Sequence, residues 1–388
     1  MLWGGGLTSA KLVVVLARCI AILHWEVGLP TSRGTSRNGE ASQVHRQVYE
    51  KVVESELPRV SVVVPCLDEA ASIEACLLSL IAGDYPKDLV EILVVDGGSS
   101  DGTRQFVEQM AQQYPPIRLL TNPRGMTSAG LNIGIQAASG DIVLIAGAHA
   151  RYSKGYISRS ISALDVDAAD CVGGPVTALP SASGIVAEAI AMALSCRFGV
   201  GNARFRVSSE PGYVDTVAYG AYRREVFGRV GLFDERLVRN QDIEFNSRLR
   251  RAGGKIYMTP EIRSYYYCRA SLRGLWKQSF QNGQWNVYTI ALAERSLSWR
   301  HVVPLGFVTG LFGTGLLALR LPTFGWLFGG ITTSYIVSAV IAALRTSGGR
   351  HTGSRALLPL VFLVLHLSYG LGSLWGIVTL ARVRRHGH

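Results

Sequence analysis

The fold of this chain is decided by the stretch VVDGGSSDGT at residues 94–103. With Ile92 and Leu93 before it, the stretch begins as a short apolar run, which is typical of a buried parallel strand. The run stops at glycine, serine and aspartate, which favour tight turns. Asp96 is therefore predicted at the carboxyl end of a strand, where open α/β sheets bind ligands and glycines let backbone N–H groups approach phosphates. Taken alone, the stretch also fits a polar surface turn.

The segments on either side repeat this arrangement. Residues 59–65 form a second apolar run, which ends in a polar turn at 66–69 before a helical pattern over 70–81. A third unit follows, with strands predicted at 117–120 and 140–146 and a helix between them. Because successive strand–helix units build parallel sheets, the sequence predicts an α/β domain.

Four motifs carry a family resemblance. They are VPCLDE at 64–69, VDGGSSDGT at 95–103, the glycine, alanine and asparagine pattern within 125–134, and GD at 140–141. Their order resembles the donor half of a family 2 glycosyltransferase, over roughly residues 58 to 290. The nearest branch is that of the succinoglycan-type membrane glucosyltransferases. The resemblance implies a GT-A fold, a Rossmann-like and mostly parallel sheet flanked by helices, followed by C-terminal transmembrane helices.

The resemblance also implies where the donor nucleotide binds. In the family, the turns after the first two strands cradle the nucleoside. Asp96 can accept a hydrogen bond from uracil N3–H or from a ribose hydroxyl. Asp101 either contacts the donor or caps the helix that follows it. The donor-binding residues predicted in this way are Pro65, Cys66, Glu69, Asp96, Gly125 and Asn132.

The motif GAHA at 147–150 departs from the family. Family members place Asp-x-Asp here, and the succinoglycan-type branch has Asp-Ala-His-Ala, so Gly147 replaces the first carboxylate. His149 is the predicted ligand of a divalent metal, Mg²⁺ or Mn²⁺, that neutralises the departing diphosphate. The alternatives are a buried, hydrogen-bonded histidine and a charge contact from Arg151.

The predicted catalytic base lies in RNQDIEFNSRL at 239–249. The resemblance places an acidic pair here, and Asp242 matches the aspartate that deprotonates the acceptor hydroxyl, while Gln241 stands in for the other acid. Inversion at an anomeric carbon needs such a carboxylate opposite the leaving group. The alternative is a carboxylate that only interacts with the helix dipole. Gly220, in the preceding segment, is assigned to the acceptor region.

A further motif, QNGQW at 281–285, resembles the Gln-x-x-Arg-Trp of processive polysaccharide synthases but lacks the arginine. We therefore expect the transfer of one sugar per encounter. Gln281 and Trp285 are predicted to bind the acceptor, since an indole can stack on a sugar. Alternatively, Trp285 belongs to an amphipathic interfacial helix over about 275–293.

Apolarity rises sharply after residue 301, which predicts membrane-spanning segments. The predicted parts are a possible amphipathic or membrane-associated helix at 1–29, a polar linker at 30–57, the catalytic domain at 58–270, an interfacial segment at 271–300 and a membrane domain at 301–388 with spans at 301–319, 324–344 and 356–381.

The orientation of these spans raises a conflict. A cytoplasmic catalytic domain and a cytoplasmic basic loop at 345–355 agree with each other, but a third full span would place the basic residues 382–385 outside. The positive-inside rule opposes that arrangement. The alternative is a re-entrant hairpin that bends near Gly370 and Gly372; continuous hydrophobicity favours three spans, in a multi-pass protein of the cell membrane.

The net charge of +11 does not indicate a nucleic-acid partner, since the basic residues are spread and no binding motif occurs. Anionic lipid is the simpler partner. The six cysteines lack metal-site spacing and are expected to be reduced in a cytoplasmic domain.

These observations predict a membrane-anchored, inverting, non-processive glycosyltransferase. It would move a hexose from a nucleoside diphosphate sugar, most simply UDP-linked, to a lipid-linked saccharide in polysaccharide or glycolipid synthesis. One alternative is a degenerate sugar-nucleotide-binding membrane protein without catalysis, which Gly147 motivates. The other is a Rossmann-type oxidoreductase, which fits poorly because no Gly-x-Gly-x-x-Gly follows either strand.

Overall fold

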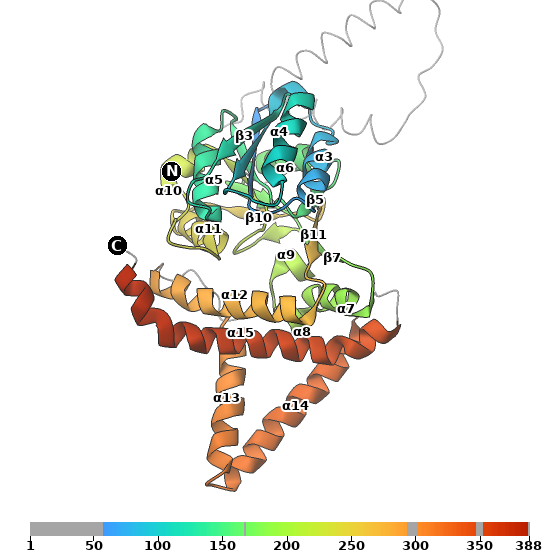
Figure 1. Cartoon of the computed structure of the whole chain (residues 1–388), viewed down its shortest axis with the longest axis vertical. Helices are drawn as coiled ribbons and strands as arrows, with labels where there is room; N and C mark the ends of the chain where they lie inside the picture. The colour runs from blue at the N-terminus through green and yellow to red at the C-terminus, as the bar shows by residue number, and fades with distance from the viewer. Residues whose placement is uncertain (1–56, 167, 293–300, 347–351, 387–388) are drawn as a thin grey trace, which may run out of the picture. The chain divides into compact units, whose positions relative to one another are not determined.

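The computed structural model describes residues 57–166, 168–292, 301–346 and 352–386. The segments predicted at 1–29 and 30–57 lie outside this range, apart from Leu57, as does the end of the interfacial segment at 293–300. From Pro58 onward the chain forms one compact unit (Figure 1).

A mixed sheet of eight strands forms the centre of this unit. Its first half is parallel, and β1 and β2 pair in register so that Cys66 lies opposite Asp96. In their order across the sheet the strands are β3 (Ile117–Thr121), β2 (Val90–Asp96), β1 (Val60–Cys66), β4 (Ile142–Ile145), β9 (Ala221–Arg223), β6 (Cys171–Gly173), β10 (Ile256–Met258) and β8 (Gly212–Tyr213). The predicted α/β architecture with a mostly parallel donor half is therefore confirmed.

The central strands are apolar on both faces because helices cover both faces. Val62, Val63 and Val64 are consecutive in β1, and each is fully buried. Such a run suits a parallel strand inside a sheet rather than one with a wet face. The helices of the catalytic part are α3 (Ile73–Ile81), α4 (Thr103–Gln113), α5 (Thr127–Ala137), α6 (Tyr156–Val166), α7 (Ile185–Leu194), α8 (Arg197–Val200), α9 (Arg204–Val207), α10 (Glu225–Val230) and α11 (Gln241–Arg251), with a 3₁₀ turn η1 at Lys87–Leu89.

A second sheet of three strands lies beside the site. It consists of β5 (Ala150–Tyr152), β11 (Ser264–Cys268) and β7 (Val176–Pro180), in that order. β11 runs antiparallel to β5 and places Tyr266 opposite Ala150. This pairing brings an aromatic side chain of the second half of the domain next to the GAHA segment.

Four helices follow the catalytic part: α12 (Leu272–Leu292), α13 (Val303–Ala318), α14 (Thr323–Arg345) and α15 (Thr352–His386). α15 lies lengthwise along α12, while α13 and α14 extend away from it as a hairpin (Figure 1). α15 is one continuous helix through Gly370 and Gly372, without the bend that a re-entrant hairpin would require.

Two of these helices are long and apolar enough to cross a membrane. They are α14, which is 23 residues long, and the stretch of α15 from Thr352 to Leu380. α13, at 16 residues, is apolar but shorter. On α14, Trp326 is 86% exposed and Leu344 is 70% exposed, so large apolar side chains face outward rather than into a protein core. An apolar exterior of this kind marks a surface that contacts lipid or another apolar partner.

Candidate functional site

Three turns meet at the carboxyl edge of β1, β2 and β3. The Gly97 N–H donates to the Cys66 carbonyl at 2.8 Å, and the Asn122 N–H donates to the Asp96 carbonyl at 2.7 Å. A Cβ on Gly97 would lie 3.3 Å from both the Cys66 carbonyl oxygen and the Gly125 Cα. Glycine is needed here because two backbones pass so close to its own. The structure thus brings together the predicted donor residues Pro65, Cys66, Asp96 and Gly125.

Asp96 is almost completely buried at this edge. Its carboxylate accepts hydrogen bonds from the backbone N–H groups of Gly98 and Ser99, each at 3.2 Å, and its Oδ2 atom lies 3.5 Å from Arg104 Nη1. A carboxylate has about four acceptor positions, so these contacts leave capacity for a ligand. Asp96 therefore stabilises the turn that follows it, through its hydrogen bonds to Gly98 and Ser99. Its contact with a nucleoside stays a prediction.

Asp101 fastens the second turn to the first. Its carboxylate accepts from the Thr103 N–H at 3.0 Å, at the start of α4, and from the Ala70 N–H at 2.9 Å. Thr103 Oγ1 in turn accepts from the Glu69 N–H at 2.8 Å. The structure shows Asp101 in the helix-end role, and its contact with the donor stays a prediction. The hydrogen bonds hold both turns in one rigid cradle.

Glu69 and His149 form a pair at the mouth of the cradle. Glu69 Oε1 lies 3.0 Å from His149 Nδ1, and Ser72 Oγ donates to Glu69 Oε2 at 2.6 Å. Burial alone would raise the pKa of the Glu69 carboxyl, but the hydrogen bonds from His149 and Ser72 and the charge of Arg269 lower it below its usual value. Glu69 is thus ionised at neutral pH and orients the exposed imidazole, whose Nε2 atom faces away from this bond.

The pKa of the Cys66 thiol is shifted in the opposite direction from that of Glu69, upward. Burial, with the nearby charges of Asp96, Glu69 and Asp101, raises its pKa to about 12. The thiolate is the nucleophilic form of cysteine, so a neutral thiol at physiological pH is not a nucleophile. Cys66 serves as a small buried residue at the end of β1, as the sequence predicts.

The space beside Gly147 is filled by a tyrosine. A Cβ on Gly147 would lie 2.6 Å from Cε1 and 3.0 Å from Oη of Tyr219. The Tyr219 ring is held in place, because its edge packs on Tyr152 and its carbonyl accepts from the Tyr156 hydroxyl at 2.6 Å. The first carboxylate of the family's metal motif is therefore absent, and the Tyr219 ring occupies the space where its side chain would begin.

This arrangement bears directly on metal binding. Within the described residues, no group of three or more histidine, cysteine, aspartate or glutamate side chains could hold a metal ion. A metal-binding histidine usually donates its other ring N–H to a carboxylate. Because the ionised Glu69 carboxylate can only accept, His149 donates to it from Nδ1. The site thus fits a single protein ligand, the Nε2 atom of His149, for an ion that arrives with a diphosphate.

Asp242 lies in the first turn of α11, after Asn240 in the left-handed conformation (φ 61°). Burial raises the pKa of its carboxyl, against the opposing effect of the N–H groups at the start of α11 and the charge of Arg206. A carboxylate with a raised pKa is a better proton acceptor than an ordinary aspartate. Behind it, Asn246 donates to Thr216 Oγ1 at 2.8 Å and accepts from the Tyr222 hydroxyl at 2.9 Å, which secures α11 to the sheet.

Arg206, on α9, is a site residue that the sequence analysis missed. Its guanidinium carbon lies 5.2 Å from the centre of the Tyr266 ring, and that ring is 5.4 Å from the imidazole of His149. Arg206 therefore lies close to the GAHA segment, and its charge lowers the pKa of Asp242. No local motif marks it, because α9 reaches the site only through the tertiary fold.

Gln281, a predicted acceptor residue on α12, contacts the segment directly before α11. Arg239 donates to Gln281 Oε1 at 2.7 Å and to Asn282 Oδ1 at 3.1 Å, and Asn240 donates to Asn286 Oδ1 at 2.8 Å. The Oε1 atom of Gln281 thus already accepts a hydrogen bond from Arg239, a residue that the sequence analysis did not single out. Trp285 packs edge-on against Tyr288 on the same helix, with ring centres 5.2 Å apart.

Two predicted residues serve packing rather than the cradle. Asn132 is buried, donates to the Phe233 carbonyl and Glu235 Oε1, each at 2.9 Å, and accepts from the Phe233 N–H. A Cβ on Gly220 would lie 2.9 Å from Cys171 Sγ, so the residue is needed for close packing beside β6. The Asn132 amide is bonded to Phe233 and Glu235 rather than directed at the cradle, and ligand contacts of Asn132 and Gly220 stay predictions.

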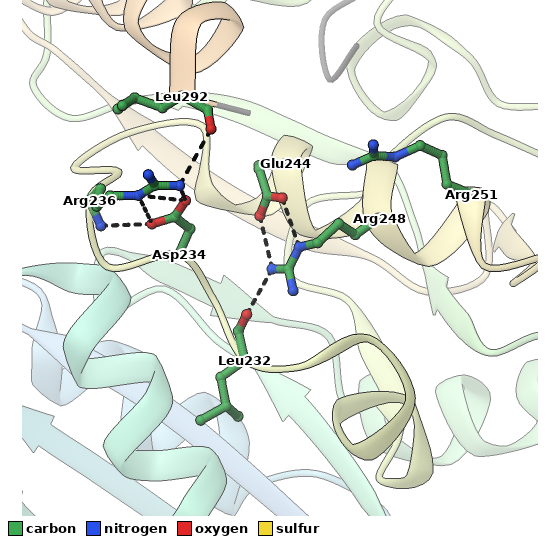
Figure 2. Close-up of a pocket in the computed structure, with 7 residues that line it drawn as sticks. All are labelled: Leu232, Asp234, Arg236, Glu244, Arg248, Arg251 and Leu292. Atoms are coloured by element: carbon green, nitrogen blue, oxygen red, sulfur yellow. Dashed lines mark hydrogen bonds and ion pairs between the residues drawn. The ribbon is translucent and has the colours of Figure 1, made fainter. Parts of the chain in front are cut away.

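A hollow of about 500 Å³ lies apart from these residues, near the end of α12. In Figure 2 its charged side chains pair with each other: Arg248 with Glu244 at 2.7 Å, and Arg236 with Asp234 at 2.7 Å. Arg251 also lines it. Since these pairs satisfy each other, and none of the donor-cradle residues contributes, we do not assign the hollow to substrate.

Comparison with known proteins agrees with this geometry. Residues 61–231 match the family model described as glycosyl transferase family 2. The chain is 30% identical over 261 residues to the succinoglycan biosynthesis protein ExoA of Rhizobium meliloti, covering 66% of this chain and 78% of that protein.

A second relative covers more of the chain. A dolichyl N-acetyl-α-D-glucosaminyl phosphate 3-β-D-2,3-diacetamido-2,3-dideoxy-β-D-glucuronosyltransferase of Methanococcus voltae is 28% identical over 324 residues, 80% of this chain and 95% of that one. Among solved structures, the mannosyltransferase PcManGT from Pyrobaculum calidifontis, in complex with GDP-Man and Mn²⁺, superposes with a TM-score of 0.56 at 18% identity, over 94% of this chain and 99% of that one. The structural likeness supports the GT-A fold.

Proposed function

Because the chain belongs to glycosyl transferase family 2, and is thus a glycosyltransferase that uses a nucleotide sugar, we propose that it is an inverting, non-processive hexosyltransferase with Asp242 as its base. The observation that carries this proposal is the position of Asp242. The charge of Arg206 lowers the pKa of Asp242, and Arg206 lies over the Tyr266 ring, which packs against His149. Burial outweighs this effect and raises the pKa of Asp242, as a general base requires.

The reaction follows from this arrangement. Asp242 takes the proton of the acceptor hydroxyl, whose oxygen forms a bond to the anomeric carbon. The bond from that carbon to the diphosphate breaks, and its electron pair leaves with the nucleoside diphosphate. Attack from the side opposite the leaving group inverts the anomeric centre. Asp242 later gives its proton to water.

A divalent ion bound with the donor would neutralise charge on the departing diphosphate, and His149 Nε2 is the atom that would contact it. The chain's own groups do the rest. Glu69 holds the imidazole, and the joined turns at Asp96 and Asp101 hold the cradle open. We propose Mg²⁺ or Mn²⁺ as this ion.

For the donor we propose a UDP-linked hexose. The buried carboxylate of Asp96 at the strand end suits recognition of a uracil N3–H or of a ribose hydroxyl. The solved relative binds GDP-Man, so the nucleotide has to be tested directly. Thermal shift with UDP-, GDP- and dTDP-sugars is the measurement, because the correct donor stabilises the folded protein by mass action.

For the acceptor we propose a lipid-linked saccharide. The Methanococcus voltae relative is named for a dolichyl phosphate-linked sugar. In this chain the loop that carries the base is hydrogen-bonded to α12, which packs along α15 (Figure 1). A lipid-linked substrate would therefore present its sugar at the layer where the membrane helices meet the site.

We further propose how the chain lies in the membrane. α13 and α14 would cross the bilayer as a hairpin, since at about 1.5 Å per residue they extend about 24 and 35 Å, against about 30 Å of hydrocarbon. α15 would lie along the cytoplasmic surface beside α12. This arrangement keeps the basic residues 382–385 on the side of the catalytic domain and satisfies the positive-inside rule without a third span.

Substitution of Asp242 by asparagine tests the function. We expect transfer to fall by about 10² to 10⁴-fold, the range for loss of a general base, with UDP affinity unchanged. The thermal midpoint at pH 7 should stay equal or rise, because a folded-state pKa raised by burial means that the ionised carboxyl costs stability at neutral pH. Wild-type turnover by this variant would rule out the assignment.

A further inference from the structure

An arginine at the centre of the site has a hydrogen-bond donor without an acceptor. Arg206 Nη1 is buried, and no acceptor within the described part of the chain reaches it. Its guanidinium carbon lies 5.2 Å from the centre of the Tyr266 ring and 5.7 Å from that of Phe205, so aromatic faces hold it in place. A buried donor on a charged group is costly to leave unsatisfied. A ligand that supplies an oxygen there would remove the cost.

Two further arginines, Arg239 and Arg269, add positive charge near Tyr266. Burial lowers the pKa of the Arg239 guanidinium, and the nearby charge of Arg269 lowers it further. Arg269 directly follows β11, whose Tyr266 ring lies 5.4 Å from the imidazole of His149. The hydrogen bonds of Arg239 go to the neutral amides of Gln281 and Asn282. Like charges brought together in this way favour an anionic ligand.

Gln241, the residue next to Asp242, also has a polar atom without a hydrogen-bond partner in the described part of the chain. Gln241 Oε1 is buried and is without a hydrogen-bond partner among the residues that the structure describes. Two unmet polar atoms, Arg206 Nη1 and Gln241 Oε1, thus lie in the neighbourhood of Asp242. Buried polar groups are normally paired, so a cluster of unpaired ones points to a ligand that completes the site.

The positive charge of these arginines can replace a metal ion that the lost carboxylate of the metal motif would have held. Tyr219 fills the space beside Gly147, so this chain cannot hold an ion with that carboxylate. A guanidinium can neutralise a phosphate without an ion, through two parallel N–H bonds. We propose that Arg206, Arg239 and Arg269 form a guanidinium site for a phosphate group, with Arg206 as the residue that contacts it.

This proposal rests on the proposed function, which supplies two sources of the phosphate group: the diphosphate of the donor, and the phosphate of a lipid-linked acceptor. The geometry is compatible with both. The Tyr266 side of Arg206 adjoins His149, whereas Phe205 packs against the apolar cluster that includes Phe362 of α15. The shared ligand chemistry is a phosphate oxygen beside the base.

Calorimetric titration of the full-length protein in EDTA, with UDP and separately with a short polyprenyl phosphate, distinguishes the sources. We expect Arg206→Gln to weaken one probe by about tenfold or more, the usual loss for a charge-assisted hydrogen bond. A loss for UDP identifies the donor diphosphate, and a loss for the polyprenyl phosphate identifies the acceptor. Arg206→Lys should recover part of the affinity, because it keeps the charge but not the planar fork.

The matched control is Arg251→Gln, which removes the same charge at the separate hollow in Figure 2. It should bind both probes as the wild type does, so that general electrostatics are excluded. Wild-type affinity of Arg206→Gln for both probes would overturn the proposal. Since titration needs no turnover, that result is distinct from a failure of Asp242 as the base, which the transfer assay reports. Should Arg206→Gln not fold, Arg206→Lys is titrated instead. A partial loss of affinity for one probe supports the proposal, and wild-type affinity for both probes overturns it.

Discussion

At the scale of single residues, the site depends on how burial changes ordinary side chains. Burial raises the pKa of the Asp242 carboxyl, while hydrogen bonds and a nearby arginine lower that of Glu69. In the proposed mechanism the two carboxylates therefore differ: Asp242 accepts a proton, while Glu69 stays ionised and holds His149. Pairs of acids with divergent pKa values are a mark of catalytic sites.

The raised pKa of Asp242 predicts the pH dependence of the enzyme. A protonated Asp242 cannot accept the acceptor's proton, so kcat/KM should fall on the acid side with a midpoint above about 3.9, the ordinary value for aspartate. A pH–rate profile measures this midpoint. A midpoint at or below the ordinary value would contradict the assigned role of burial.

The Gly147 and Tyr219 pair predicts the effect of restoring the lost carboxylate. Gly147→Asp alone should destabilise the protein, because its Cβ would lie 2.6 Å from the Tyr219 ring. Adding Tyr219→Ala should make room, and the double variant with UDP should bind Mn²⁺ about tenfold or more tightly than the wild type, the effect of an added metal-site group. Calorimetry measures the affinity. An unchanged thermal midpoint for Gly147→Asp alone would show that Tyr219 does not fill this space.

At the scale of elements, α12 links α15 to the segment directly before Asp242. Its contact with α15 depends on glycines: a Cβ on Gly283 would lie 1.9 Å from the Tyr369 carbonyl oxygen, and one on Gly372 would lie 2.0 Å from that of Phe280. The pair is also joined by hydrogen bonds, including Asn286 to the Tyr369 hydroxyl and Tyr288 to Thr379 at 2.6 Å. Small residues let two backbones approach this closely.

Substitution of Gly372 by alanine should therefore lower the apparent thermal midpoint of the purified protein, by an overpacking cost of about 1–3 kcal/mol. The matched control is Gly329→Ala on α14, where an added Cβ meets nothing within 4 Å. That change should be neutral or stabilising, since alanine favours a helix over glycine. Equal midpoints for the two variants would refute the close packing of α12 and α15.

At the scale of the whole molecule, the arrangement of α13, α14 and α15 is the basis of the proposed topology. α13 and α14 lead away from α15 and return to it, while α15 stays beside α12 and contacts α7 of the catalytic part (Figure 1). Its apolar sequence is explained in part by this packing, since Leu358, Val361 and Phe362 are fully buried. Hydrophobicity alone cannot distinguish such a helix from a span.

Labelling of introduced cysteines in intact cells tests the proposed topology. Leu321→Cys, at the exposed tip between α13 and α14, should react with an impermeant maleimide from outside. Glu108→Cys on α4 should react only after the cells are opened, and so should a cysteine added after His388. External labelling of the added cysteine in intact cells would restore the three-span prediction.

The first strands and their turns could be predicted because their signals are local. The β-branched runs at β1 and β2 are buried in register, and the turns after them meet as expected. Asn132 shows the limit of such reasoning, because its partners, Phe233 and Glu235, are about a hundred positions away in the chain. Nothing in a local motif states whether a polar side chain faces a ligand or another loop.

The sequence by itself determined the α/β fold, the donor cradle, the place of Asp242 and the loss of the carboxylate at Gly147, since each depends on residue type and spacing along a short segment. Only the tertiary structure decided that Tyr219 fills the gap, that Arg206 packs over Tyr266 and that α15 packs along α12. The physical reason is distance along the chain. These contacts join segments separated by tens of residues, and close packing rather than local preference selects them.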